Sequence, residues 1–354
     1  ECLVGVKDNQ PLLERFPYVD VFSPPSDPRP LLEYLLQREA HSAEEAETAR
    51  RFAVMDGDLV LPHNNLTNHV SGWIPVVYGC SHACAYCIIP YRRGVEKSRP
   101  PEEIYAEARS LASQGIKEIT LLGQIVDRYG KDHPEYPTLD GLLRELHKID
   151  GIERLRFLTS HPNYMTDELL DVVAELPKVM PHLEIPNQAG DDDVLAAMKR
   201  GYTADQYRRL VEKVRARIPG VSIATDIIVG FPGETDAQFQ NTYDLLAELK
   251  LDVVHLARYS PRVGTVSERF MEDDVPDAEK WRRFRAIEQL QESIVREIHA
   301  RYLDTTVEVL FEEKVKKRWR GRTPTNKLVF VETEQDLRGQ ILPVHINWTG
   351  PWSM

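Results

Sequence analysis

Cysteine is scarce in this sequence, with four among 354 residues, three of them close together. So few cysteines exclude a disulfide framework and favour a reducing, cytoplasmic compartment in which thiols bind metal. No apolar run approaches the roughly 20 residues of a membrane span, so no membrane association is expected. An excess of positive charge is also missing, because 44 Lys and Arg stand against 56 Asp and Glu, a net charge of −12. This balance argues against nucleic-acid affinity over the whole surface.

The basic charge that exists is concentrated near the C-terminus. Residues 301–354 hold nine Lys and Arg against seven Asp and Glu, whereas the remainder holds 35 against 49. Within this segment, "KVKKRWRGR" at 314–322 has six basic side chains and no acidic one. Such a run is often only a solvated, charged hairpin. Its concentration in an acidic chain favours RNA, with phosphates held by cations and a base stacked on the indole. The candidates are Lys316, Lys317, Arg318, Trp319 and Arg320.

The middle of the chain alternates between two kinds of segment. Apolar, β-rich runs lie at 73–79, 116–123, 155–160, 182–188, 221–231 and 252–260, with helical stretches between them. Thr203 and Gln206 predict a capping box at the start of one helix. Such alternation predicts six parallel strands joined by helices, as a complete or partial β/α barrel. Catalysis in such barrels takes place at the C-terminal ends of the strands.

The flanking segments predict three domains, at 1–72, 73–300 and 301–354. A long helix at 277–303 leads out of the barrel. Short strands at 306–313, 328–333 and 339–349 predict a small all-β module of a size that suits a barrel. The chain starts at Glu1 in what reads as the middle of a folding unit, so we expect upstream residues to be missing.

Three cysteines, Cys80, Cys84 and Cys87, follow the first predicted strand with the spacing C-x3-C-x2-C. A closed zinc site needs four ligands, and His82 could supply the fourth. A four-iron cluster normally takes four thiolates, so three would leave one iron open for a reactive ligand. Three buried structural cysteines are the remaining alternative, which this spacing in a loop disfavours.

The cysteine motif, with Tyr86 before its last member, resembles the signature of radical S-adenosylmethionine (SAM) enzymes. Further stretches resemble, in the same order, those of the radical-SAM methylthiotransferases: "LLGQIVDRYG", "LTSHP", "IPNQAGDDDVLAAMKRGYT", "TDIIVGFPGET" and "YSPRVGT". The resemblance covers residue 73 to the C-terminus and, less closely, 1–40. Departures from the family pattern stand at Ile125, Asn187 and Ala189.

The resemblance implies a fold class and cofactors. The fold is α/β, with a partial radical-SAM β/α barrel, a truncated N-terminal α/β domain and a C-terminal TRAM barrel that holds RNA. Cys80, Cys84 and Cys87 would bind a 4Fe–4S cluster, and SAM would chelate its open iron. A second 4Fe–4S cluster would have Cys2 as one ligand, with its two partners missing from this chain.

The same resemblance implies further site residues. Those expected to bind SAM are Tyr86, Gly123, Gln124, Ser160, Glu184, Asp226, Ile228 and Gly230. Asp226, an acid in an apolar strand, needs a partner; that partner is SAM or a buried cation such as Arg200 or Arg258. His161 carries little weight because a single histidine is more often structural. Residues expected to contact RNA are Gln188 and the TRAM signature Gly321, Arg322, Thr323, Asn326 and Lys327. No catalytic side chain is expected beyond the ligands of the cluster and SAM.

The activity that the resemblance implies is methylthiolation at C2 of N6-isopentenyladenosine in tRNA. The expected partners are the tRNA anticodon stem-loop and an electron donor such as flavodoxin or ferredoxin, and the expected state is a monomer. Methylthiolation of threonylcarbamoyladenosine in tRNA, or of a ribosomal protein, remains an alternative. A non-catalytic protein that binds zinc and RNA is a more distant one.

Overall fold

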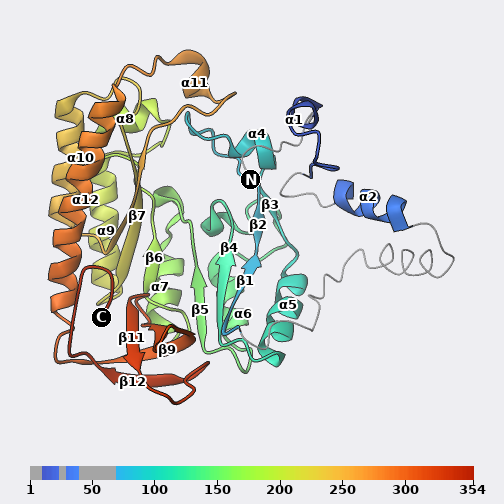
Figure 1. Cartoon of the computed structure of the whole chain (residues 1–354), viewed down its shortest axis with the longest axis vertical. Helices are drawn as coiled ribbons and strands as arrows, with labels where there is room; N and C mark the ends of the chain where they lie inside the picture. Colours follow the sequence, from blue (N-terminus) through green and yellow to red (C-terminus); the bar gives the residue numbers. More distant parts are fainter. Residues whose placement is uncertain (1–9, 24–28, 40–68) are drawn as a thin grey trace.

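Six parallel strands form a curved, open sheet with helices on its outer side (Figure 1). The computed structural model describes residues 10–23, 29–39 and 69–354. Two three-stranded sheets lie side by side, in the order β1–β4–β5 and β6–β7–β8. A hydrogen bond from Ser160 N to Glu184 O (3.0 Å) and a bridge between Leu155 and Val179 join them. The strands are β1 (Ser71–Pro75), β4 (Glu118–Leu122), β5 (Arg154–Phe157), β6 (His182–Glu184), β7 (Ser222–Val229) and β8 (Val253–Arg258).

These strands confirm the six predicted positions. All four residues of β5 are buried, as are most of β7, which explains the nearly continuous apolar runs. Side chains of the strands and helices form one core, in which Ile74, Ile119 and Leu155 are fully buried. Each such side chain contributes roughly 1.5–3 kcal/mol through removal of apolar surface from water.

The helices begin where their sequences indicate. The predicted capping box of Thr203 and Gln206 opens α9, and Thr235 with Gln238 forms a second one at α10. Among the described residues, no helix has both the length and the apolar character to cross a membrane. The main helices are α5 (Pro101–Ser113), α6 (Leu139–Leu146), α7 (Asp167–Glu175), α8 (Asp192–Ala197), α9 (Ala204–Arg217), α10 (Asp236–Leu249) and α12 (Asp277–Ala300). Shorter elements are α1 (Gln10–Arg15), α2 (Arg29–Glu39), α4 (Ile89–Arg93), α11 (Val266–Phe270), β2 (Val77–Tyr78) and β3 (Lys97–Ser98).

The C-terminal segment forms a four-stranded antiparallel sheet in the order β11–β10–β9–β12. Its strands are β9 (Thr306–Val315), β10 (Arg318–Arg322), β11 (Leu328–Glu332) and β12 (Ile341–His345). Three of the four were predicted, whereas β10 was interpreted only as a basic run. The sheet has a core of its own, which includes Phe311 and Trp319.

This sheet packs against the N-terminal ends of the barrel strands, far from α4 (Figure 1). Two buried arginines of β5 make the junction. Arg154 donates to the carbonyl oxygen of Arg322 (2.7 Å), and Arg156 donates to those of Thr323 (3.0 Å) and Pro324 (2.9 Å). Arg156 is also paired with buried Glu118 at 2.9 Å. The turn after β10 therefore closes one end of the barrel.

Candidate functional site

The cysteine loop lies between β2 and α4, at the C-terminal end of the first barrel strand. Gly79 leads into it with a φ of +67°, and an added Cβ would lie 2.2 Å from the carbonyl oxygen of Val95, so only glycine fits. Within the loop, Ala85 N donates to Met198 O (3.0 Å), and Ser267 N donates to Ala85 O (2.8 Å). These bonds tie the loop to two later parts of the chain.

None of these three cysteines is in a disulfide. Cys80 is buried, and burial is the main reason why its pKa is raised, although the backbone N–H of His82 (3.4 Å from Sγ) opposes the shift. Arg200, itself buried, donates to Sγ of Cys84 at 3.3 Å. A guanidinium and a backbone N–H aimed at sulfur stabilise thiolates and metal–thiolate bonds.

The spacing of the thiols bears on the zinc alternative. Among the described residues, only one group of three or more His, Cys, Asp or Glu has all its ligand atoms within 4.8 Å of one another, and the thiols are not in it. Zinc–sulfur bonds of about 2.3 Å in a tetrahedron would bring sulfurs closer than that. His82 is engaged elsewhere, because its Nε2 is 2.8 Å from the Tyr164 hydroxyl and its ring lies 4.4 Å from that of His161. The arrangement of the described thiols and His82 therefore does not match a closed Cys3His zinc site.

Buried polar atoms without partners lie just beyond β4, β5 and β6. Within the described part of the chain, no hydrogen bond is made by Oδ1 of Asp127, Oγ of Ser160, Nε2 of His161 or either amide atom of Asn187. Each unsatisfied buried group costs about 1–3 kcal/mol. So many at the C-terminal ends of barrel strands indicate that a polar ligand satisfies them. Asp127, His161 and Asn187 therefore join the candidate site, although sequence analysis gave them little or no weight.

Burial shifts the two titratable groups of this set. Burial raises the pKa of Asp127 to about 7, although the backbone N–H of His161 (2.9 Å from Oδ2) opposes the shift. Burial, with the nearby cation of Arg200, lowers the pKa of His161 to about 2. His161 is therefore neutral at physiological pH.

A second polar group lies across β6, β7 and β8. Glu184, Asp226 and His255 form the one group whose ligand atoms all lie within 4.8 Å. Nε2 of His255 is 3.2 Å from Oε1 of Glu184, and this contact raises the pKa of His255. Burial and then the charge of Glu184 raise the pKa of Asp226. Sequence analysis named both acids but missed His255, whose position depends on strand register with Asp226.

The cations proposed as partners of Asp226 are occupied elsewhere. Arg200 contacts Cys84, Tyr202 and the carbonyl oxygen of Pro186. Arg258 pairs with Asp277 at 2.6 Å and lies 3.8 Å from the ring centroid of Trp281. The prediction of a direct ion pair from Asp226 to either arginine is therefore wrong, because both guanidiniums are bound in other contacts.

Glu234, which the sequence analysis did not single out, holds the turn after β7. Gly230 has a φ of +69°, and its N–H donates to Oε2 of Glu234 at 2.6 Å. Glu234 is also paired with Arg283 of α12 at 2.8 Å, and both side chains are almost fully buried. The acidic residue in "GFPGET" was the signal in the sequence that could have identified it. Ile228, on the same face of β7 as Asp226, donates its N–H to the carbonyl oxygen of Gln188 at 2.9 Å.

The remaining predicted SAM residues lie close to the cysteine loop. Tyr86 packs, partly buried, in the cluster that contains Phe231 and Tyr259. Burial raises the pKa of Tyr86 well above its usual value. Gly123 ends β4 so closely to Val77 that an added Cβ would lie 3.1 Å from its Cβ. Gln124 is next to it and partly exposed. Cys2 lies outside the described residues.

The C-terminal sheet corrects two RNA predictions. Trp319 is only 3% exposed and lies in the core of the sheet, so its indole face cannot stack on a base. Lys327 is buried in an ion pair with Asp252 (2.6 Å), which removes its ammonium from the free surface. Asn326 lies 3.3 Å from Nε2 of His182 but is partly exposed, so its contact with RNA stays a prediction.

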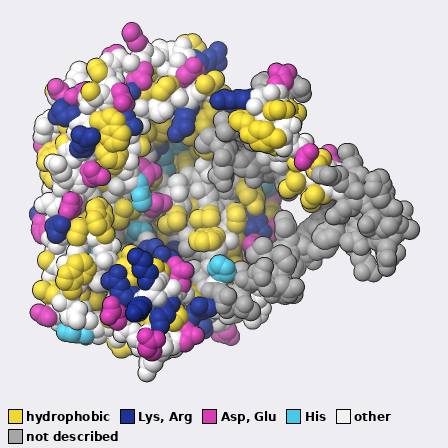
Figure 2. Space-filling view, viewed as in Figure 1, with side chains coloured by type: hydrophobic (Ala, Val, Ile, Leu, Met, Phe, Trp, Pro, Cys, Tyr) yellow, Lys and Arg dark blue, Asp and Glu magenta, His cyan; other side chains and the backbone are white. Residues whose placement is uncertain are grey.

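Cations nevertheless gather over this sheet (Figure 2). Arg320 pairs with Glu313 at 2.5 Å, Arg322 with Glu312 at 3.3 Å, and Lys314 with Glu334 at 3.3 Å. Lys316, Lys317 and Arg318 are exposed and form no ion pair within the described ranges. These last three are the cations most available to an external polyanion.

Comparison with known proteins adds independent findings. Residues 74–246 match the Radical SAM superfamily. The chain is 46% identical over 356 residues to the tRNA-2-methylthio-N(6)-dimethylallyladenosine synthase of Roseiflexus sp. (strain RS-1), covering 100% of this chain and 72% of that protein. Identity to the synthase of the same name from Chloroflexus aurantiacus (strain ATCC 29366 / DSM 635 / J-10-fl) is 45% over 357 residues, covering 100% and 74%. A solved structure, the radical S-adenosylmethionine methyltransferase TsrM from Kitasatospora setae, has a TM-score of 0.48 and 22% identity, covering 57% of this chain and 39% of that one.

Proposed function

This chain belongs to the radical SAM methylthiotransferases, in the family of tRNA-2-methylthio-N(6)-dimethylallyladenosine synthases, and on that premise we propose that it methylthiolates C2 of N6-dimethylallyladenosine in tRNA. The observation that carries the proposal is the cysteine loop. It presents three cysteines that form no disulfide, two of them supported by Arg200 and the His82 N–H, at the end of a barrel strand.

In this proposal Cys80, Cys84 and Cys87 hold a 4Fe–4S cluster. When bound, the cluster and SAM would supply one-electron chemistry. Arg200 offsets the negative charge of the thiolates. The unsatisfied atoms of Asp127, Ser160, His161 and Asn187 are the groups available to a polar cofactor such as SAM.

Other groups keep this end of the barrel in one shape. Glu234 fixes the Gly230 turn through its N–H and through Arg283. Neutral His161 lies over His82 without charge repulsion. Glu184, Asp226, Ile228 and Gln188 lie on the adjoining strands or just beyond them, where the adenosine of SAM or of the substrate would be contacted.

The remaining parts of the proposal concern partners. Lys316, Lys317 and Arg318 would hold RNA phosphates. Cys2 would ligate a second 4Fe–4S cluster that supplies sulfur, and this part is supported by the sequence resemblance. A small one-electron carrier such as flavodoxin or ferredoxin would reduce the first cluster, and the enzyme would act as a cytoplasmic monomer.

Anaerobic reconstitution tests the proposal. We expect the full chain to bind iron and sulfide, to absorb visible light as iron–sulfur proteins do, and to release 5′-deoxyadenosine from SAM. Replacement of Cys80, Cys84 and Cys87 by Ala should abolish this cleavage, whereas Cys2→Ala should retain it. Mass spectrometry of tRNA nucleosides should detect the 2-methylthio product only when the two missing ligands of the second cluster are also supplied. Cleavage of SAM by the triple variant would refute the assignment.

A further inference from the structure

A cavity of about 390 Å³ opens at the end of the barrel away from the cysteines. It begins at the first residues of three strands, His182 of β6, Ser222 of β7 and Val253 of β8. Helix α12 forms one wall, and the turn between β10 and β11 with Pro351 and Trp352 forms the other. The candidate cofactor site lies at the opposite ends of the same strands, so the two sites are separate. The volume is typical of a site for a small planar molecule or one base.

The walls of the cavity suit an aromatic ring. Val254 and Leu256 of β8 line it together with Phe284 and Ile287 of α12. Trp352 lies on the rim with 65% of its surface exposed. An exposed indole beside apolar walls offers a stacking face, and stacking on an aromatic side chain accepts any base.

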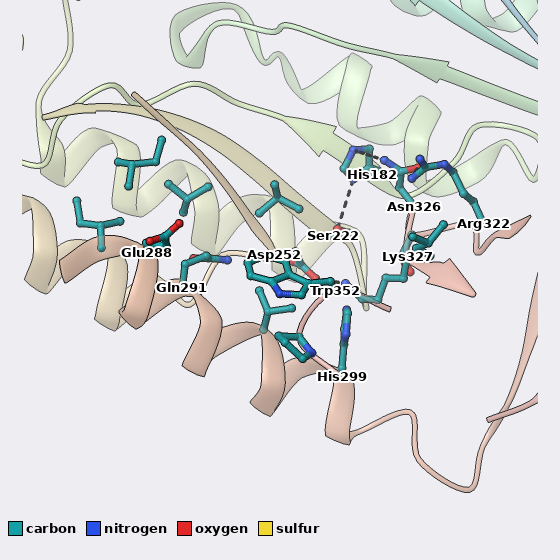
Figure 3. A pocket seen from close by; sticks show the side chains of 18 of the residues that line it. His182, Ser222, Asp252, Glu288, Gln291, His299, Arg322, Asn326, Lys327 and Trp352 are labelled. Carbon is teal, nitrogen blue, oxygen red and sulfur yellow. Dashed lines mark hydrogen bonds and ion pairs between the residues drawn. The ribbon is translucent and has the colours of Figure 1, made fainter. Parts of the chain in front are cut away.

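The polar end of the cavity holds His182, Ser222 and Asn326, which contact one another (Figure 3). Nδ1 of His182 is 3.4 Å from the Ser222 hydroxyl, and its Nε2 is 3.3 Å from the Asn326 amide. Burial, with the nearby cation of Arg156, lowers the pKa of His182 to about 3, so the ring is uncharged. The Lys327 ammonium is neutralised by Asp252 at 2.6 Å. Such an end can exchange hydrogen bonds with the edge of a base, whereas a buried phosphate or carboxylate would need a free cation.

The rim continues into the basic strand. Arg322 lines the cavity and is the last residue of β10, which starts next to the unpaired cations Lys316, Lys317 and Arg318. Phosphates held along this strand would leave bases free to turn towards Trp352.

We propose that this cavity receives one unstacked nucleobase of the RNA strand that lies along β10. The base stacks on Trp352 and meets the neutral polar end with its edge, while its phosphate stays outside the cavity. The inference rests on the proposed function, since it takes the RNA to be the substrate. It adds a second contact, remote from the cofactors, by which the substrate is held.

The test uses the full chain with its cluster reconstituted and an unmodified tRNA transcript. Trp352→Ala should weaken binding about tenfold, within the range for one stacked base. Trp352→Phe should restore most of the affinity. Trp348, which is 59% exposed in the same segment but does not line the cavity, gives the matched control Trp348→Ala, whose affinity should equal wild type. Equal effects of the two alanine variants would overturn the proposal.

RNA with abasic sites identifies which nucleotide places its base in the cavity. Single abasic sites are placed in turn at each unpaired nucleotide, and one position should reproduce the loss seen with Trp352→Ala. The two losses should not add, because they remove the same contact. Absence of any coupled position would overturn the proposal, and so would binding of a free nucleoside monophosphate at Trp352 without such coupling. Cleavage of SAM by the same wild-type preparation is measured in parallel. A wild type that cleaves SAM but shows no Trp352 effect refutes the cavity alone, whereas a wild type that cannot cleave SAM refutes the proposed function.

Discussion

Binding of tRNA should lose salt dependence when the unpaired cations of the C-terminal sheet are neutralised. The perturbation is the triple variant Lys316→Gln, Lys317→Gln and Arg318→Gln. These side chains are exposed and without ion pairs in the described part of the chain, so each is free to displace counterions from RNA. Gln keeps length and polarity, and none of the three lies in the core of the sheet.

The size of the effect follows from the number of free cations. Each phosphate contact contributes about 0.7–0.9 to the slope of log K against log salt. Loss of three contacts should therefore flatten the slope by roughly 2 to 3. Over a fourfold rise in salt, wild-type affinity should then fall about 30-fold more than that of the triple variant.

Paired cations of the same run provide the control. Lys314→Gln with Arg320→Gln removes two charges that Glu334 and Glu313 already neutralise. We expect a slope change below about 1 for this double variant, because a paired cation displaces few counterions. Fluorescence anisotropy with labelled tRNA between 50 and 200 mM salt measures both slopes. Equal slope changes per charge in the two variants would refute the distinction between paired and unpaired cations.

Three further predictions concern stability, measured by urea unfolding. Glu234→Gln should cost about 3 kcal/mol because it leaves the buried Arg283 charge without its most buried partner, whereas Glu279→Gln, at the more exposed partner of Arg283, should cost clearly less. Asp127 has a pKa of about 7 in the folded state against 3.8 in the unfolded state, so it should lower the free energy of unfolding as pH rises from about 4 to 7. Asp127→Asn should remove up to about 4 kcal/mol of that decline, and an unchanged pH profile would count against the raised pKa of Asp127. His182 has a pKa of about 3 in the folded state against 6.5 in the unfolded state, so the free energy of unfolding should fall below pH 6.5, by about 2 kcal/mol at pH 5. His182→Gln should lack this loss if the lowered pKa of His182 is correct.

The barrel was predictable because its signals are local. A parallel strand buried on both faces needs an apolar run, as in β5 and β7, and a capping box needs only residues three apart. The cysteine motif is equally local, since all three thiols fall within eight residues of one loop.

Strand β10 was not predicted from the sequence, because few apolar residues lie on the face that packs into the core of the C-terminal sheet. It alternates exposed Arg318 and partly exposed Arg320 with buried Trp319 and Gly321. Gly321 lies so close to β9 that an added Cβ would be 2.5 Å from Cγ1 of Val309. The alternation of charge with a buried residue was nevertheless a period-2 signal.

The other contacts of the candidate site could not be predicted from the sequence, because they join residues from different strands and loops. Arg200 was expected beside Asp226, yet it follows α8 and reaches Cys84, 116 positions earlier in the chain. His255 meets Glu184 only because β6 and β8 both flank β7. Sequence spacing carries no information on such contacts unless the strand order and register are known.

The sequence stretch that resembles a TRAM signature, residues 321–327, lies where the C-terminal sheet meets the barrel. Its turn meets the barrel mainly through backbone carbonyl oxygens of residues 322–324, which accept hydrogen bonds from Arg154 and Arg156. Side chains of the turn are needed only where they enter the junction themselves, as Lys327 does with Asp252. The signature therefore fixes the C-terminal sheet on the barrel and leaves phosphate binding, in our proposal, to the cations at the other end of β10. A substrate bound to that sheet is thereby held at a constant distance from the cysteine loop, because both belong to one packed unit.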